Sequence, residues 1–268
     1  MLSIVRTLLA RSGAPGGSPR IPAYPAAPTD ICLYVIGDIH GRADLLLDVF
    51  QRIDRDWSGV SVGSRTCLEV YLGDYIDRGP QSRRVIDLLI ERCRSRTCVF
   101  VRGNHEATLL RLIGSPFHAP TARIWLQIGG IATAVSYGAK DIPRGSDDEA
   151  LAGFVTALRA AVPPAHQRFL QETVECFNCG PYVFAHAGIR PGVALEEQAT
   201  EDLFWIREPF LDATGDHGFI VVHGHTAVID VDFRPNRINI DTGAYATGKL
   251  TCLRIDHRGP RPLPPTGQ

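Results

Sequence analysis

Apolar runs and amphipathic runs alternate through the first 113 residues of the chain. The apolar runs are short and rich in β-branched and aromatic residues, which is typical of buried strands. They cover 31–36, 67–72 and 97–101. Each is followed by helical periodicity, which predicts helices over 43–55, 82–94 and 105–113. Such alternation predicts an α/β fold with a sheet built from strand–helix units.

The rest of the chain is helical at first and strand-rich afterwards. Helices are expected over 123–127, 147–161 and 163–175, the last opened by two prolines. Apolar runs predict strands over 182–185, 219–222, 237–240 and 250–255. The pattern as a whole predicts two sheets with helices outside them, in one domain.

Both ends differ in composition from this middle part. Residues 1–30 are rich in arginine, proline and glycine and carry no acidic residue before Asp30, which predicts a disordered N-terminal tail. An Arg-rich, acid-poor leader could instead be a targeting segment. The proline-rich end predicts a second, short tail over 258–268. The folded domain is therefore expected to cover 31–257.

Charge and cysteine content narrow the class of protein. The 28 basic and 29 acidic residues nearly cancel, so no net field recruits nucleic acid or membranes. No apolar run approaches the roughly 20 residues that span a bilayer. The seven cysteines are odd in number and scattered, which favours free thiols in a reducing compartment. We therefore expect a cytoplasmic protein with neither a nucleic-acid partner nor a membrane partner.

Three of the predicted strands end in a polar motif flanked by glycine. The motifs are Gly37-Asp38-Ile39-His40-Gly41, Gly73-Asp74-Tyr75-Ile76-Asp77-Arg78-Gly79 and Gly103-Asn104-His105-Glu106. Open α/β sheets carry their chemistry at the carboxyl ends of strands. Glycine at such a corner permits a sharp turn and the close approach of a ligand. Three corners in series predict one shared site.

Two more histidines follow predicted strands in the second half of the chain, and they complete a candidate set of metal ligands. The set is Asp38, His40, Asp74, Asn104, His186 and His225. Oxygen and imidazole donors without a thiolate favour manganese, iron or zinc over calcium. Six donors are too many for one open catalytic ion and suit two divalent ions that share Asp74, the middle ligand.

The other histidines are expected to have lesser roles. His223 is expected to lie beside the site. The four without supporting context are expected at the surface: His118, His166, His217 and His257.

This ligand set predicts hydrolysis of a phosphate ester. Two cations about 3.5–4 Å apart can lower the pKa of a shared water toward neutrality, and the resulting hydroxide can attack phosphorus in line. His105 would act as the general acid on the leaving oxygen, with Asp77 orienting its ring. The planar guanidinium of Arg78 can bind phosphate oxygens.

The three motifs, in this order, resemble the signature of metallophosphoesterases of the PPP superfamily, the serine/threonine protein phosphatases. The closest resemblance is to compact bacterial and phage members such as the phage lambda phosphatase. Further similar segments are Trp205-Ile206-Arg207-Glu208, His223-Gly224-His225-Thr226 and Ile240-Asp241-Thr242-Gly243-Ala244. The resemblance implies a calcineurin-like metallophosphoesterase fold, a two-sheet β-sandwich flanked by helices in four layers (αββα).

The resemblance also implies a role for each matching position. Asp38 and His40 would hold the first metal, Asp74 would bridge, and Asn104, His186 and His225 would hold the second. Arg78 and Arg207, together with Asn104, would bind the substrate phosphate. Manganese is the usual activating metal.

The preferred interpretation is a serine/threonine protein phosphatase acting on a phosphorylated protein or peptide. The alternatives are a symmetrical dinucleoside tetraphosphatase, which hydrolyses diadenosine tetraphosphate, and a phosphatase of small phosphate esters. Two residues disfavour the tetraphosphatase. Glu106 is the last residue of the third motif, where the motif of those enzymes resembles Gly-Asn-His-Asp. Asp77 is an acidic residue that those enzymes usually lack. A non-catalytic binding scaffold is disfavoured because every ligand position is filled. Selectivity is expected from loops in 115–138 and 187–214.

Overall fold

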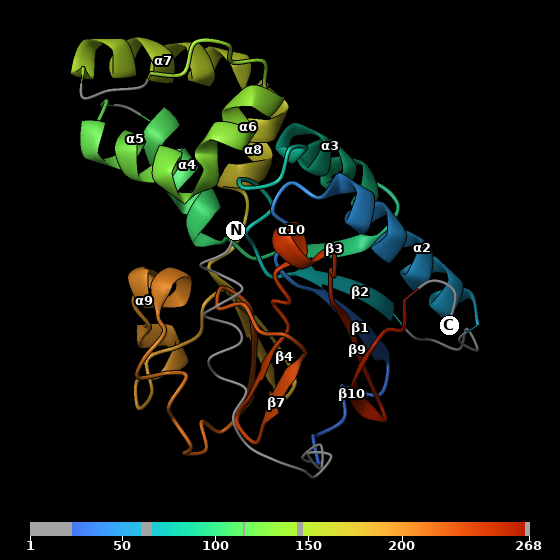
Figure 1. Cartoon of the computed structure of the whole chain (residues 1–268). Coiled ribbons are helices and arrows are strands. Elements are labelled where there is room, and N and C mark those ends of the chain that lie inside the picture. Colours follow the sequence, from blue (N-terminus) through green and yellow to red (C-terminus); the bar gives the residue numbers. More distant parts are fainter. Residues whose placement is uncertain (1–22, 60–65, 115, 144–146, 266–268) are drawn as a thin grey trace.

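The strands predicted at the start of the chain lie side by side in the first of two sheets. The computed structural model describes residues 23–59, 66–114, 116–143 and 147–265 (Figure 1). In spatial order, the first sheet contains β10 (Gly259–Pro262), β9 (Cys252–Asp256), β1 (Ile31–Ile36), β2 (Thr66–Tyr71) and β3 (Thr97–Phe100). β1, β2 and β3 are parallel, so the corners that follow them share one edge of the sheet.

The second sheet is built from the strand-rich part of the chain. In spatial order, it contains β4 (Cys176–Cys179), β5 (Tyr182–Ala185), β6 (Ile220–His223), β8 (Arg237–Asn239) and β7 (Asp232–Arg234). β5, β6 and β8 are parallel, while β4 and β7 run antiparallel at the edges. Both sheets are therefore mixed.

Helices cover the outer faces and one end of the two sheets (Figure 1). Three follow the three corners: α2 (Ala43–Ser58), α3 (Ser82–Arg92) and α4 (Asn104–Ile113). The helical middle contains α5 (Ala119–Trp125), the π-helical turn η1 (Leu126–Gly130), α6 (Ile131–Ser136), α7 (Asp148–Ala161) and α8 (Pro164–Gln171). The later elements are the 3₁₀ turn η2 (Leu195–Glu197), α9 (Thr200–Trp205) and α10 (Ala244–Thr247).

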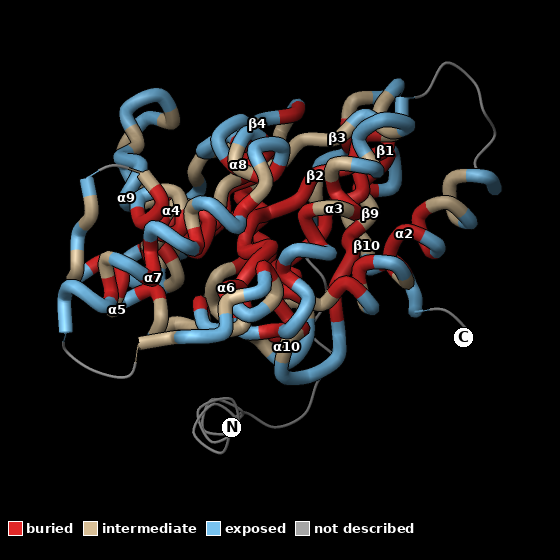
Figure 2. The backbone as a smooth tube through the Cα atoms, turned by 90° about the horizontal axis from the view of Figure 1, so that it is seen from above, coloured by how far each residue is buried: buried red, intermediate tan, exposed pale blue. Residues whose placement is uncertain are grey.

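Alternation along the strands explains the layers. In β1, Leu33 and Val35 enter an apolar cluster with Phe184 and Val222 of the second sheet, while Tyr34 faces the opposite way into the cluster under the helices. A third cluster joins the outer face of the second sheet to α9. Buried residues, red in Figure 2, run through β2 and β9 between helices whose outer sides are exposed. The predicted four-layer arrangement is confirmed.

Parts of both predicted tails belong to the folded domain. The backbone N–H of Ala27, itself buried, donates to Asp256 O at 3.1 Å, so residues 23–30 pack on the domain. The remainder of the predicted N-terminal tail, residues 1–22, lies outside the described residues. At the other end, residues 259–262 form β10 on β9, and the N–H of Leu263 donates to Cys252 O at 2.8 Å. The prediction of a tail from residue 258 was wrong because prolines are compatible with an edge strand.

Two further predictions differ from the structure. The helix expected over 163–175 ends at Gln171, because the chain turns there into a strand, β4, that lacks clear alternation. His166, expected at the surface, is buried: its Nε2 lies 3.0 Å from Asp87 Oδ1 and its Nδ1 lies 2.9 Å from the Tyr137 hydroxyl. Among the described helices, none is long and apolar enough to cross a membrane.

Candidate metal and phosphate site

The first two corners are joined by their backbones at the carboxyl edge of the first sheet. The N–H groups of Ile39 and His40 donate to Asp74 O at 3.1 and 2.8 Å, and the N–H of Gly41 donates to Tyr75 O at 2.8 Å. These bonds bring Asp38 and His40 beside Asp74 without any side chain taking part. The parallel pairing of β1 and β2 therefore determines which polar residues meet.

The carboxylate of Glu106 joins the second corner to the third. It is fully buried and accepts four backbone N–H bonds, from Asp74 and Tyr75 at 2.8 Å, Gly103 at 3.0 Å and Ile76 at 3.3 Å. A carboxylate has acceptor sites for all four donors. Glu106 therefore holds the backbone that carries Asp74, and its side chain faces the protein rather than a substrate.

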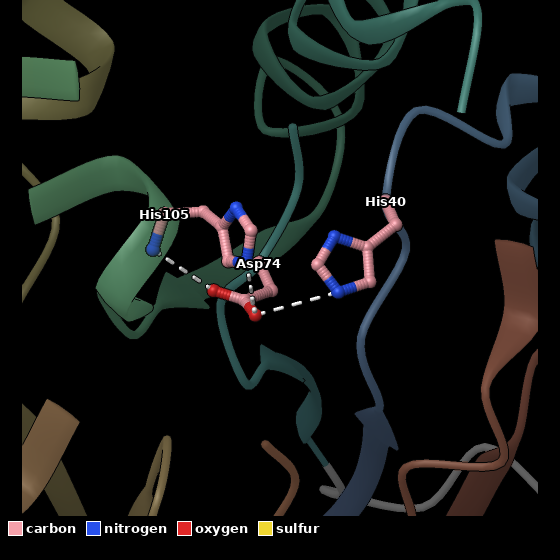
Figure 3. A group of neighbouring side chains, drawn as sticks. All are labelled: His40, Asp74 and His105. Atoms are coloured by element: carbon pink, nitrogen blue, oxygen red, sulfur yellow. Dashed lines mark hydrogen bonds and ion pairs between the residues drawn. The ribbon is translucent and has the colours of Figure 1, made fainter. Parts of the chain in front are cut away.

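Asp74 lies at the centre of the site (Figure 3). Its Oδ2 is 3.4 Å from His40 Nε2 and 3.7 Å from His105 Nε2, and its Oδ1 is 3.4 Å from His186 Nε2. Two groups of potential ligand atoms overlap at this carboxylate, each spanning less than 4.8 Å: His40, Asp74 and His105, and Asp74, His186 and His225. Asp74 belongs to both groups, as a bridging ligand would.

The remaining predicted ligands lie against these groups. Asn104 Oδ1 is 2.9 Å from His186 Nε2 and 3.0 Å from His225 Nδ1. The N–H of His225 donates to Asp38 Oδ2 at 3.0 Å, which brings the first and last ligands in the sequence together. Only glycine fits before His225, since a Cβ on Gly224 would overlap Asp38 Oδ1. The structure therefore brings all six predicted ligands together.

The ionisation of these residues fits divalent cations. Burial lowers the pKa of His186 and, together with His186, lowers that of His225 to about 2, so both rings are neutral, as ligands must be. Burial and neighbouring carboxylates raise the pKa of Asp38 well above its usual value. Asp38 Oδ1 and His225 Nε2 are buried polar atoms without a hydrogen-bond partner. Such atoms are costly unless a ligand uses them, and two divalent ions would do so.

His105 and Asp77 form a hydrogen-bonded pair beside Asp74. His105 Nδ1 lies 2.7 Å from Asp77 Oδ2, so the Nδ1–H donates to the carboxylate. Burial disfavours the charged imidazole, but Asp74 and Asp77 outweigh it and raise the pKa of His105. A cationic ring with Nδ1 engaged keeps its Nε2 proton for transfer, which is the arrangement of a general acid.

Exposed arginines lie at two ends of the site. The Arg78 guanidinium lies 5.0 Å over the ring of Tyr245, and its Nη1 is 2.8 Å from His40 Nε2. Arg207 lies at the other end: after burial and the effect of His186, its charge contributes to the lowered pKa of His225. The Arg78 guanidinium can therefore reach an anion bound near Asp74, and the charge of Arg207 acts on the site from the His225 side.

The site is built from strained backbone. Among the described residues, five non-glycine residues have positive φ, and all five belong to the site: His40 (46°), Asp74 (50°), Asp77 (71°), Arg78 (65°) and His225 (65°). Such conformations cost about 1–3 kcal/mol each and persist where the surroundings impose them. Their confinement to these residues is independent evidence that this is the functional centre.

Thr133 and Tyr245 belong to the site but were not predicted from the sequence, because neither stands in one of the three motifs. Glu106 stands in the third motif, but its role as an anchor of the backbone was not predicted. The only available signal for Tyr245 was its position directly after a segment of the resemblance, Ile240-Asp241-Thr242-Gly243-Ala244. Asp241, which stands in that segment, is a buried turn residue whose Oδ1 accepts the Gly243 N–H at 2.8 Å.

The two-sheet fold with a His/Asp/Asn cluster at its strand ends defines a metallophosphoesterase. A family model for calcineurin-like phosphoesterases matches residues 33–252, and the chain belongs to this family. The predicted calcineurin-like fold is thereby confirmed, and the protein is a phosphoester hydrolase. This outcome removes the alternative of a non-catalytic scaffold.

The chain is similar along most of its length to two proteins that are named as tetraphosphatases. The chain is 26% identical over 238 residues to the asymmetrical bis(5'-nucleosyl)-tetraphosphatase PrpE of Anoxybacillus flavithermus, across 82% of this chain and 89% of that protein. It is 27% identical, with the same coverage, to the protein of that name from Halalkalibacterium halodurans.

Solved structures share the fold at lower identity. One described as a candidate diadenosine tetraphosphatase has a TM-score of 0.58 and 19% identity, and covers 90% of this chain and 100% of its own. A cold-active protein-tyrosine phosphatase from a psychrophilic Shewanella has a TM-score of 0.50 and 15% identity, covering 89% of this chain and 83% of its own. At these identities the likeness is one of fold.

Proposed function

We propose that the protein hydrolyses dinucleoside tetraphosphates asymmetrically, so that water and diadenosine tetraphosphate give ATP and AMP. The observation that carries this proposal is the similarity to the PrpE tetraphosphatases, which extends over 82% of the chain. The comparisons thus favour an alternative over the protein phosphatase preferred from the sequence. The sequence-based alternative was the symmetrical reaction, whereas these relatives are named for the asymmetrical one.

The sequence argument against a tetraphosphatase rested partly on Glu106, and the contacts of Glu106 weaken it. All four of its hydrogen bonds go to backbone N–H groups, so its length is suited to anchoring a corner. A residue that faces the protein interior does not select between phosphopeptides and nucleotides. Asp77 likewise faces His105, and a protonated leaving group is useful to either reaction.

The arginines suit a substrate with several phosphates. Arg78 lies at the His40 end of the site and Arg207 toward the His225 end, and both guanidinium groups are exposed. Guanidinium groups bind phosphate oxygens in pairs of parallel hydrogen bonds. We assign both arginines, with the Asn104 side chain, to binding the phosphate chain on either side of the cleaved bond.

His105 is assigned the proton transfer. Its Nδ1–H bond to Asp77 at 2.7 Å fixes the orientation of the ring, which leaves the Nε2–H to protonate the departing phosphate oxygen. Asp38, His40, Asp74, Asn104, His186 and His225 would hold two divalent ions, most simply manganese, with iron or zinc as the other candidates. When bound, the ions would activate water and neutralise phosphate charge.

A phosphorylated protein or a small phosphate ester is the second candidate substrate. The observation that favours it is the Gly73–Gly79 motif with its Asp77, which resembles the motif of serine/threonine protein phosphatases.

We also propose a cytoplasmic location, because all seven cysteines are free and free thiols persist in a reducing compartment.

One assay separates these substrates. Purified protein with Mn²⁺ is given diadenosine tetraphosphate, phosphoserine, phosphothreonine and phosphotyrosine peptides, and 4-nitrophenyl phosphate, and the nucleotides are resolved by anion exchange. We expect kcat/KM to be at least about tenfold higher for the dinucleotide, with ATP and AMP in equal amounts. Two equivalents of ADP would instead identify the symmetrical reaction. A preference for any phosphopeptide would overturn the proposal. Asp74→Asn should abolish turnover of every substrate.

A further inference from the structure

The corner that carries Asp77 and Arg78 is held by a helical segment from elsewhere in the chain. This segment comprises η1 and α6, residues 126–136, within one of the two regions where the sequence led us to expect selectivity loops. The N–H of Arg78 donates to Gly129 O at 3.1 Å, and Arg78 Nε lies 3.4 Å from Ile128 O. Both the backbone and the side chain of Arg78 are thus bound to η1.

Thr133, one helical turn further on, binds Asp77. Its hydroxyl donates to Asp77 Oδ1 at 2.6 Å and accepts the Asp77 N–H at 2.8 Å. The hydroxyl is fully buried, and Ser82 Oγ lies 2.8 Å from it. Because Thr133 takes one carboxylate oxygen, the other oxygen of Asp77 is directed to His105 Nδ1, at 2.7 Å.

These contacts hold backbone that would not keep its conformation unaided. Asp77 and Arg78 are consecutive non-glycine residues with φ of 71° and 65°, in the left-handed region. Gly129 also has positive φ, 122°, and a Cβ there would lie 2.7 Å from Arg78 Cγ and 2.8 Å from Arg78 N. The π-helical turn therefore depends on a glycine at the point where it meets the strained corner. Irregular helical turns of this kind are frequent at functional sites.

We propose that Gly129 and Thr133 are positioning residues for catalysis, acting through Arg78 and Asp77 respectively. Thr133 orients Asp77 and, through it, the His105 ring that protonates the leaving group. Gly129 orients the guanidinium that binds phosphate. The inference rests on the roles proposed above for His105 and Arg78. It predicts two separable defects, one in proton donation and one in phosphate binding.

The test for Thr133 uses leaving groups of different quality, since a good leaving group needs little help from a general acid. Thr133→Val removes the hydroxyl at similar shape, and Thr133→Ser keeps it. With Mn²⁺, we expect Thr133→Val to lower kcat about 10- to 100-fold for an alkyl phosphate and less than about threefold for 4-nitrophenyl phosphate, with KM unchanged. Thr133→Ser should restore kcat to within about threefold. Thr156→Val on α7, whose exposed hydroxyl donates to Ala152 O, is the matched control and should leave both rates unchanged.

His105→Asn is the reference variant, because it tests the acid role of His105 separately from the positioning role of Thr133. Its loss of kcat should also be greater for the alkyl phosphate than for 4-nitrophenyl phosphate, and larger than the loss in Thr133→Val. If His105→Asn shows the dependence and Thr133→Val does not, the positioning role is overturned while the acid assignment stands. If His105→Asn slows both substrates equally, the acid assignment fails and the role of Thr133 fails with it.

Gly129→Ala tests whether Gly129 supports phosphate binding through Arg78. This test does not depend on whether Thr133→Val folds. Inorganic phosphate is the probe, as a competitive inhibitor of 4-nitrophenyl phosphate hydrolysis. We expect the inhibition constant to rise about tenfold, as it should for Arg78→Ala, with a smaller change in kcat. An inhibition constant within about twofold of the wild-type value, in a variant with a wild-type melting temperature, would overturn the role of Gly129.

Discussion

Replacing Glu106 with glutamine should destabilise the whole domain although it removes no charge from the surface. In the native protein, Glu106 Oε2 accepts the N–H groups of Asp74 and Gly103, and Oε1 accepts those of Tyr75 and Ile76. The amide of glutamine offers one oxygen and one NH₂ group. Whichever way it is turned, two buried backbone N–H groups lose their acceptor and face another donor.

The expected cost follows from those two groups. A buried donor left unsatisfied costs about 1–3 kcal/mol, so the pair costs about 2–6 kcal/mol. Domains of ordinary stability have about 5–15 kcal/mol in total, so the variant loses a large part of it. Each kilocalorie lowers the melting temperature of a domain of this size by about 2–4 °C. Activity should fall as well, because the corner that carries Asp74 is loosened.

Urea unfolding followed by circular dichroism measures the difference directly. Glu91→Gln is the matched control, because that carboxylate is exposed and forms a surface ion pair with Arg94, just beyond the end of α3; it should change stability by less than about 1 kcal/mol. If Glu106→Gln also unfolds within about 1 kcal/mol of the wild type, Glu106 is not the anchor that its hydrogen bonds indicate.

Other consequences can be measured with single variants. Gly224→Ala should lower the affinity for Mn²⁺, measured by calorimetry, because its Cβ overlaps Asp38 Oδ1. The same overlap should lower the free energy of unfolding by about 1–3 kcal/mol. Gly153→Ala on α7 is the control: a Cβ there meets open space, and the free energy of unfolding should rise by about 0.5–1 kcal/mol. Wild-type affinity in Gly224→Ala would contradict the proposed first metal site. Arg207→Ala should raise KM about tenfold with less effect on kcat, and an unchanged KM would place that arginine outside substrate binding. Burial lowers the pKa of His166, so the unfolded chain binds its proton more readily and the free energy of unfolding falls as the pH drops below about 6.5. In His166→Gln, the free energy of unfolding should depend less on pH between about pH 7 and 5. An unchanged pH dependence would assign the loss of stability to other groups.

The corner residues were predictable because their chemistry and their local structure coincide in short motifs. A strand that ends in glycine and an acid specifies both a turn and a ligand, and parallel pairing then brings successive corners to one edge. Asp38, Asp74 and Asn104 could therefore be placed together before any coordinates were known. His186 and His225 followed by the same logic from the second sheet.

The supporting residues could not be found this way. Thr133 lies 56 residues after Asp77 and Gly129 lies 51 residues after Arg78 in a helical region, and neither stands in a recognisable motif. Their role depends on how α6 packs against the corner, which is a tertiary property. His166 is different, because Phe169 and Leu170 share its helical face and all three are buried. That spacing was a readable signal for a buried histidine.

The proline-containing strand β10 has a consequence for how this protein can be handled. It covers β9, which would otherwise become the open edge of the first sheet. Pro260 and Pro262 carry no N–H, so β10 itself offers a poor template for an incoming strand of another molecule. A chain cut after Asp256 would lose this protection and present the unpaired backbone of the strand Cys252–Asp256 to its neighbours. We therefore expect solubility at high concentration to depend on residues 259–262, which pair with β9.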